Sequence, residues 1–202
     1  KVPKIVFSSS ASVYGMADAF PTEESHHPWN NDTWYGATKT CGEGMLKSFN
    51  AMYGLDYICL RYFNVYGTRM DVFGKYTEVL IRWLECFDTG EAPQIFGDGK
   101  QTMDFINAAD AAEANVLAMK ADVANKAYNI ATGEEVSLCE LLEELSRAYP
   151  GDTLPPEYQE ARSVNAVPRR LADVTAARND LGFIAQTDLS SGLKALIEWR
   201  KQ

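Results

Sequence analysis

Two side chains that could move a proton stand four residues apart in the stretch Tyr35-Gly36-Ala37-Thr38-Lys39. Residues four apart on a helix share one face, with Cβ atoms about 5–6 Å apart, so the phenol and the ammonium would project into the same space. A free tyrosine has a pKa of ~10 and is a poor base at neutral pH, but a neighbouring cation favours its ionised form. Such a pair could exchange a proton with a substrate hydroxyl. The spacing alone is a weak signal, because a solvent-facing pair would look the same.

The elements around this pair predict that it faces a ligand site. A short apolar strand over residues 5–9 runs into Ser10, and a second strand over residues 56–63 ends beside Asn64. A helix over residues 34–52 lies between them in the sequence. Because ligands of open parallel sheets bind at the carboxyl ends of the strands, we expect these polar strand ends and the tyrosine of the helix to line one crevice.

The rest of the chain is predicted to alternate between helices and short strands. A capping box at Ser137-Leu138-Cys139-Glu140 marks a helix start, and Gly97-Asp98-Gly99-Lys100 predicts a hairpin between residues 94–96 and 101–106. Further helices are expected over 76–88, 108–120, 174–181 and 189–199, a strand over 127–130, and loops over 16–34 and 150–170. Alternating strands and helices favour a parallel α/β sheet, with the hairpin and C-terminal helices as a smaller lobe.

Composition excludes several classes of partner. The 202 residues are 46% apolar and carry a net charge of −9, which makes a nucleic-acid backbone an improbable ligand. The four cysteines are far apart and have no companion histidine spacing, so we expect neither a metal site nor disulfides but the reduced thiols of a cytoplasmic protein. Apolar runs are too short to span a bilayer. His26 and His27 fall in a polar loop and are expected to be solvated.

Five ordered motifs give the chain a family resemblance. They are Phe7-Ser8-Ser9-Ser10-Ala11-Ser12-Val13-Tyr14-Gly15, Tyr35-Gly36-Ala37-Thr38-Lys39, Arg61-Tyr62-Phe63-Asn64-Val65-Tyr66-Gly67, Phe96-Gly97-Asp98-Gly99 and Tyr128-Asn129-Ile130-Ala131-Thr132-Gly133. In this order they resemble the NAD-dependent epimerase/dehydratase family of extended short-chain dehydrogenase/reductases, most of all its UDP-glucose 4-epimerase group. The resemblance implies an α/β fold with a partial Rossmann-like parallel sheet and a smaller mixed α/β substrate-binding lobe. Residues 1–67 would belong to the dinucleotide-binding domain and 68–202 mostly to the substrate lobe, with 102–133 returning to the main sheet.

The same resemblance implies a reaction and catalytic roles. The reaction would be 4-epimerisation of a UDP-hexose through a 4-keto intermediate, with NAD as the cofactor. Tyr35 would remove the proton of the sugar 4-hydroxyl, Lys39 would hold the nicotinamide ribose and lower the pKa of the tyrosine, and Ser10 would hydrogen-bond the same hydroxyl. A homodimer is implied for the full-length enzyme.

Further residues would bind the cofactor and the substrate by resemblance. Ser8, Tyr62 and Phe63 would contact the cofactor. Asn64, Ile95, Phe96 and Arg162 would contact the nucleotide-sugar, with an arginine fork on its diphosphate. Blander roles stay open: Ser10 as a turn residue, Asn64 as a strand end, Phe96 as core, and Arg162 in a surface salt bridge.

Departures from the family pattern narrow the expected chemistry. Met103 stands where many relatives have a phosphate-binding arginine, which leaves Arg162, or Arg169 and Arg170, for the diphosphate. Dehydratases of the family place an Asp-Glu pair where this chain has Ala11 and Ser12, which argues against elimination of water.

The glycine-rich loop that seats the NAD pyrophosphate is not in the sequence, so we expect roughly the C-terminal two-thirds of such an enzyme and weak NAD binding. The alternatives are a catalytically silent truncated chain or assembly module, and a related nucleotide-sugar reductase or decarboxylase.

Overall fold

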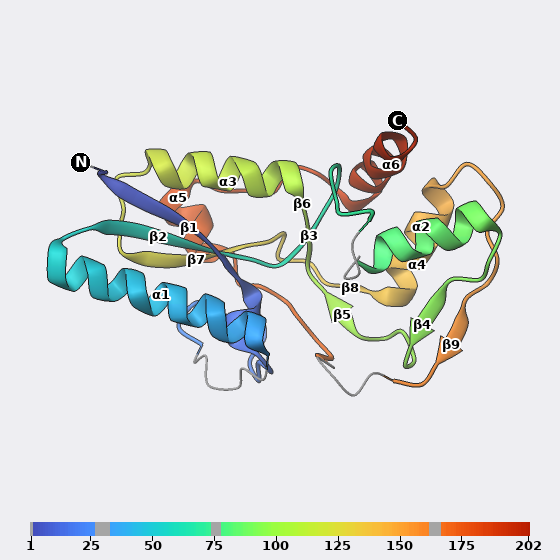
Figure 1. Cartoon of the computed structure of the whole chain (residues 1–202), viewed down its shortest axis with the longest axis horizontal. Helices are drawn as coiled ribbons and strands as arrows, with labels where there is room; N and C mark the ends of the chain where they lie inside the picture. The colour runs from blue at the N-terminus through green and yellow to red at the C-terminus, as the bar shows by residue number, and fades with distance from the viewer. Residues whose placement is uncertain (1, 27–32, 74–77, 162–166) are drawn as a thin grey trace.

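The computed structural model describes residues 2–26, 33–73, 78–161 and 167–202, and it shows two adjoining lobes (Figure 1). The first lobe is built on a parallel sheet with strand order β1-β2-β7, which are Lys4–Ser10, Asp56–Tyr62 and Lys126–Ile130. Its helices are α1 (Trp34–Tyr53), α3 (Ala108–Lys120) and α5 (Thr175–Leu181). The second lobe contains α2 (Val79–Thr89), α4 (Leu138–Ala148) and α6 (Leu189–Arg200). The predicted α/β class with a parallel sheet is confirmed.

The two faces of the sheet differ in chemistry. Successive strand side chains point to opposite faces. Ile58 and Leu60 of β2 pack with Ala114 of α3 and Leu181 of α5 in one buried apolar cluster. The alternate residues of the sheet, among them Arg61, face α1, which crosses the opposite side in Figure 1. The apolar core of this lobe therefore lies mainly under α3 and α5.

Helix α1 is well defined locally but little buried. The side chain of Thr33 accepts a hydrogen bond from the Gly36 amide at its start, and Gly54 ends it in the left-handed conformation at φ 67°. Gly36 is its one buried residue. Gly42 lets the helix approach the sheet, because a Cβ there would lie 2.5 Å from Cζ of Phe7. By contrast, a Cβ at Gly44 would meet nothing within 4 Å.

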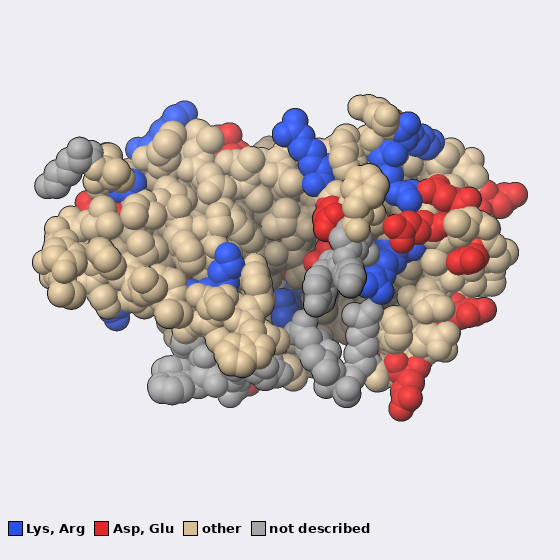
Figure 2. Space-filling view, viewed as in Figure 1, with Lys and Arg blue, Asp and Glu red and all other residues tan. Residues whose placement is uncertain are grey.

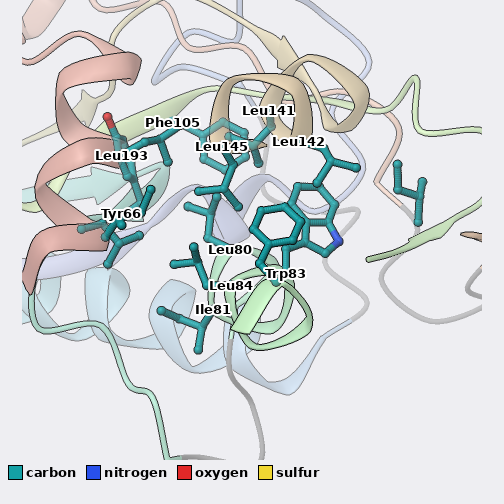
Figure 3. Close-up of a cluster of buried hydrophobic side chains, with 14 residues drawn as sticks. Tyr66, Leu80, Ile81, Trp83, Leu84, Phe105, Leu141, Leu142, Leu145 and Leu193 are labelled. Carbon is teal, nitrogen blue, oxygen red and sulfur yellow. The ribbon is translucent and has the colours of Figure 1, made fainter. Parts of the chain in front are cut away.

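The second lobe has a separate apolar core (Figure 3). Trp83 and Leu84 of α2, Leu141 and Leu145 of α4, and Leu193 of α6 are all buried in it. Each helix also contributes further buried residues three or four positions away, Leu80 and Phe87 in α2 and Leu196 and Ile197 in α6, so that one face of each helix enters this core. The predicted capping box is confirmed, since Ser137 and Glu140 bond each other's backbone amides at the start of α4.

The helix and main-strand predictions are confirmed to within a few residues. Helix α3 has the predicted bounds, and α2 begins at Val79 where residue 76 was expected, residues 74–77 lying outside the described part. The loop predicted over 150–170 holds one short strand, β9 (Glu157–Gln159). His26 was predicted to be solvated, but its side chain is 14% exposed and its ring lies 5.9 Å from that of Tyr14. His27 lies outside the described residues.

The hairpin prediction is wrong. Strand β4 (Gln94–Phe96) pairs in parallel with β9, and β5 (Thr102–Met103) pairs antiparallel with β8 (Val136–Ser137). The turn itself forms, with Gly97 and Gly99 at φ 83° and 73°. The backbone groups on both sides of this turn bond to distant segments and not to each other. The amide of Gly97 donates to the backbone oxygen of Gln159, and the amide of Thr102 donates to that of Pro168. Turn chemistry is local information and does not report such partners.

Candidate active site

A cavity of about 310 Å³ opens where the carboxyl ends of β1 and β2 meet the second lobe. Its lining includes four of the residues that the sequence placed in the crevice, namely Ser10, Tyr35, Phe63 and Asn64. Tyr62 and Arg170 also line it. The site predicted from strand ends and helix spacing is therefore brought together in one place.

The Tyr35–Lys39 pair sits at the rim of this cavity on the first turns of α1. Tyr35 is 56% exposed, so its phenol is accessible to a ligand. Nζ of Lys39 lies 5.5 Å from the centre of the Tyr35 ring and donates a 2.8 Å hydrogen bond to the backbone oxygen of Ser8. That bond fixes the ammonium beside the phenol and attaches the helix to the end of β1. Ser8 itself is exposed.

Ser10 occupies a defined turn at the end of β1. Its Oγ accepts a hydrogen bond from the amide of Ser12 and donates one to the Oγ of Ser12, both at 3.1 Å. It thereby caps the short 3₁₀ helix η1 (Ala11–Tyr14). Ser10 is 9% exposed and lines the cavity, so its turn role leaves the residue at the cavity wall.

Asn64 presents an unused acceptor. It begins β3 (Asn64–Tyr66), which pairs in parallel with β6 (Phe105–Asn107). Within the described part of the chain its Oδ1 is buried and has no hydrogen-bond partner. Buried polar atoms are nearly always satisfied, so this acceptor on the cavity wall is available to a donor from a ligand or a water molecule.

Tyr62 and Phe63 form the wall between the strand ends. The hydroxyl of Tyr62 donates to Oδ1 of Asn115 on α3 at 2.9 Å and lies 3.4 Å from Oγ of Ser8. Phe63 is 7% exposed and packs 6.4 Å from the ring of Tyr14. Both residues line the cavity and are held by these contacts.

A buried polar group behind the site was missed by the sequence reasoning. Glu43 accepts hydrogen bonds from Ser9 Oγ at 2.5 Å and from two nitrogens of Arg61 at 3.0 and 2.7 Å. Burial opposes the charge of Arg61, but the hydrogen bonds from the guanidinium to Glu43 outweigh it and raise the pKa of Arg61. One signal was available: Glu43 follows Lys39 by four residues, as Lys39 follows Tyr35, so all three share one helix face.

Two of the predicted nucleotide-sugar contacts, Ile95 and Phe96, do not line this cavity. Ile95 is 1% exposed within the core of the second lobe, and Phe96 is half-buried on β4; neither lines the cavity. Met103 is half-buried against the same core. Arg162 lies outside the described residues.

The two other arginines named for the diphosphate differ in their surroundings. Arg169 donates two hydrogen bonds to Glu135, at 2.8 and 2.9 Å, and its guanidinium lies 4.9 Å from the ring centre of Phe20. The side-chain bond from Arg169 also lowers the pKa of Glu135. Arg170, in contrast, lines the cavity together with Ser10 and Tyr35.

Comparison with known proteins agrees with this geometry. Residues 1–131 match the sequence model of the NAD dependent epimerase/dehydratase family. The chain belongs to that family. Members of the family are NAD-dependent, and the relatives of this chain include UDP-sugar epimerases and related enzymes.

Individual relatives of this family cover nearly the whole chain. The UDP-glucose 4-epimerase of Mycolicibacterium smegmatis is 35% identical over 98% of this chain. The UDP-N-acetylglucosamine 4-epimerase from Methanobrevibacter ruminantium M1, solved with UDP-N-acetylmuramic acid, superposes with a TM-score of 0.93 at 34% identity and 99% coverage. MoeE5, solved with UDP-glucuronic acid and NAD, gives 0.88 at 33% identity and 99% coverage.

The chain corresponds to only part of the length of these proteins. It covers 62% of the length of the Mycolicibacterium enzyme, 63% of the Methanobrevibacter enzyme and 65% of MoeE5. Across residues 2–26, 33–73, 78–161 and 167–202, no helix is long and apolar enough to cross a membrane. The same residues contain no group of three or more His, Cys, Asp or Glu side chains that could hold a metal ion.

Proposed function

We propose that this chain carries the proton-transfer and sugar-binding groups of an NAD-dependent UDP-hexose 4-epimerase. The supporting observation is that Tyr35, Ser10 and the open Oδ1 of Asn64 line one cavity at the carboxyl ends of parallel strands. Lys39 stands beside the phenol on the same helix face. An exposed phenol, a cation and a hydroxyl are the groups needed to take a proton from a sugar alcohol and return it.

Each side chain has a distinct task in this proposal. Tyr35, at the rim, takes the proton from the 4-hydroxyl of the sugar and later gives it back. The Oγ of Ser10 hydrogen-bonds the same hydroxyl and holds it in line with the phenol. The Oδ1 of Asn64 accepts a hydrogen bond from the nucleotide-sugar. Orientation of the hydroxyl before proton transfer is the main contribution of such groups to rate.

The residues present fit the nicotinamide end of NAD. The cofactor supplies the acceptor for the hydride that leaves C4 of the sugar. Lys39, fixed by its bond to the Ser8 oxygen, would hold the nicotinamide ribose, and Tyr62 and Phe63 would form the wall beside the ring.

For the substrate diphosphate we propose Arg170 together with Arg162. Arg170 lines the cavity, and Arg169, which forms a two-bond pair with Glu135, does not line it. Residues 1–67 then contribute the Ser/Tyr/Lys site and residues 68–202 most of the sugar-nucleotide lobe, with residues 102–133 returning to the main sheet. Ile95 and Phe96, which do not line the cavity, would contact the base beyond it.

We further propose a homodimer, formed through α1, in the cytoplasm. Met45, Phe49, Met52 and Tyr53 are 56%, 46%, 69% and 68% exposed along one side of α1, a larger apolar surface than scattered exposed residues give. The surface over α1 is mostly uncharged in Figure 2, whereas acidic side chains gather over the second lobe. A reducing compartment accords with four cysteines that are all free.

The direct experiment incubates the purified chain with UDP-galactose and NAD and measures UDP-glucose. Formation of UDP-glucose supports the proposal. A catalytically silent chain is the rival. No product at millimolar NAD, with no NAD bound by absorbance and mass, would support that rival. Parallel incubations with other UDP- and dTDP-sugars separate an epimerase from a related reductase or decarboxylase, because only the latter two change the composition of the sugar.

A further inference from the structure

One row of the main sheet is polar from edge to edge. Ser9 of β1 is in register with Arg61 of β2, and Arg61 is in register with Asn129 of β7. Side chains at one register position stand on the same face of a parallel sheet, here the face under α1. The three residues are 2%, 8% and 0% exposed. A buried polar row with a charge at its centre is costly unless it is fully paired.

Glu43 of α1 pairs this row from above. It binds Ser9 and, through both carboxylate oxygens, the fork of Arg61. The geometry is that of a bidentate arginine–carboxylate pair, which fixes direction as well as distance. Glu43 lies on the helix face that also carries Tyr35 and Lys39, two turns further along.

Arg61 also has hydrogen-bond partners other than Glu43. Its Nη1 donates to the hydroxyl of Tyr14 at 3.0 Å and to the backbone oxygen of Glu24 at 2.8 Å. Tyr14 in turn donates to Oδ1 of Asn129 at 2.6 Å. The guanidinium is thus tied to the 3₁₀ turn after Ser10 and, through Tyr14, to Asn129 of β7, so it has partners independent of α1.

Apolar packing gives α1 little else to hold it in register. Gly36 is the one buried residue of the helix, and its large apolar side chains Met45, Phe49 and Met52 are exposed. The contact of Gly42 with Phe7 limits how closely the helix approaches, but a flat ring does not fix its position along the strand. Lys39 and Glu43 each form a hydrogen bond to β1, and these polar contacts help to set that position.

We propose that Glu43 and Arg61 are positioning residues that hold Tyr35 in line with Ser10 for proton transfer. The inference rests on the proposed function. Lys39 fixes the helix to β1 at Ser8, and the Glu43–Arg61 pair fixes it to the next register position of β1 and β2. Two anchors one turn apart determine both the rotation and the axial position of α1. A displacement of about 1 Å at a reacting group can lower the rate about 100-fold.

The test compares Glu43→Gln and Glu43→Asp with the wild-type chain, all supplied with NAD and UDP-sugar. Glu43→Gln should lower kcat about 100-fold, while KM for the sugar changes less than about threefold, because Glu43 does not touch substrate. Glu43→Asp keeps a carboxylate opposite Arg61 and therefore the fold, but its side chain is one methylene shorter. It should restore kcat to within about tenfold of wild type. Glu144→Gln, which breaks the exposed pair with Arg147 on α4, is the matched control.

Amide hydrogen exchange supplies a readout that does not depend on turnover. In Glu43→Gln the first half of α1 should exchange at least about tenfold faster, while α4 and α6 keep wild-type protection. A uniform loss of protection in all helices would mean that the pair only stabilises the fold, and would overturn the inference. So would wild-type kcat and exchange in both Glu43 variants. Absence of turnover in the wild type would refute the proposed function instead, and local exchange would still decide whether Glu43 sets the register of α1.

Discussion

Replacing Asn64 by leucine should make the ligand-free protein more stable and its grip on a UDP-sugar weaker. The Oδ1 atom of Asn64 is buried without a partner in the described part of the chain. An unpaired buried carbonyl costs about 1–3 kcal/mol, and a side chain of similar shape without the polar group removes that cost. We therefore expect a gain of about 1–2 kcal/mol in the free energy of unfolding. For a chain of this length that corresponds to a rise in Tm of about 2–8 °C.

Calorimetry gives the first half of this prediction and titration with UDP-glucose the second. Loss of one well-placed hydrogen bond to the ligand should weaken binding at least about tenfold. The matched control is Asn115→Leu. Asn115 lies on α3 and uses both ends of its amide, accepting from Tyr62 at 2.9 Å and donating to the Ala111 oxygen at 2.7 Å. That variant should lose about 1–3 kcal/mol. A destabilised Asn64→Leu protein, or one that binds UDP-glucose as the wild type does, would refute the reasoning.

Two further predictions concern pH and association. Burial raises the pKa of Tyr14 to about 12, partly offset by Arg61, while an unfolded phenol ionises near ~10. The stability due to this difference, about 3 kcal/mol, is complete below pH ~10 and is lost as the pH rises through about 12. Urea unfolding of wild type and Tyr14→Phe at pH 8 and pH 11.5 should show it, and a pH-independent gap would contradict it. Phe49→Glu should convert a dimer to a monomer in sedimentation; an unchanged mass would exclude this face of α1 as the interface.

The site could be predicted from the sequence where the signal was local. The strand before Ser10, the strand before Asn64 and the helix that begins at Trp34 each follow from periodicity and boundary residues. Parallel strands must then present their carboxyl ends at one edge, and the cavity lies there. The family resemblance supplied the chemistry that this geometry could carry.

The predictions that failed, and the contacts that were missed, depend on which distant segments of the chain pair. The strands beside Gly97-Asp98-Gly99-Lys100 choose β9 and β8 over each other, which no turn signal reports. Glu43 and Arg61 are separated by a helix end and a strand, and their contact depends on how α1 lies over the sheet. The engagement of Arg169 by Glu135 is likewise a property of the folded chain. Spacing along α1 could still have drawn attention to Glu43.

Turnover of the Tyr35→Phe variant tests the central claim most directly. The substitution removes one oxygen from a side chain that is 56% exposed, so the Tm should stay within about 1 °C of wild type. Tyr53→Phe is the matched control, since Tyr53 lies on the same helix, is 68% exposed and does not line the cavity. We predict that conversion of UDP-galactose to UDP-glucose falls about 100- to 10,000-fold in Tyr35→Phe and is unchanged in Tyr53→Phe. Wild-type conversion by folded Tyr35→Phe protein would contradict the account.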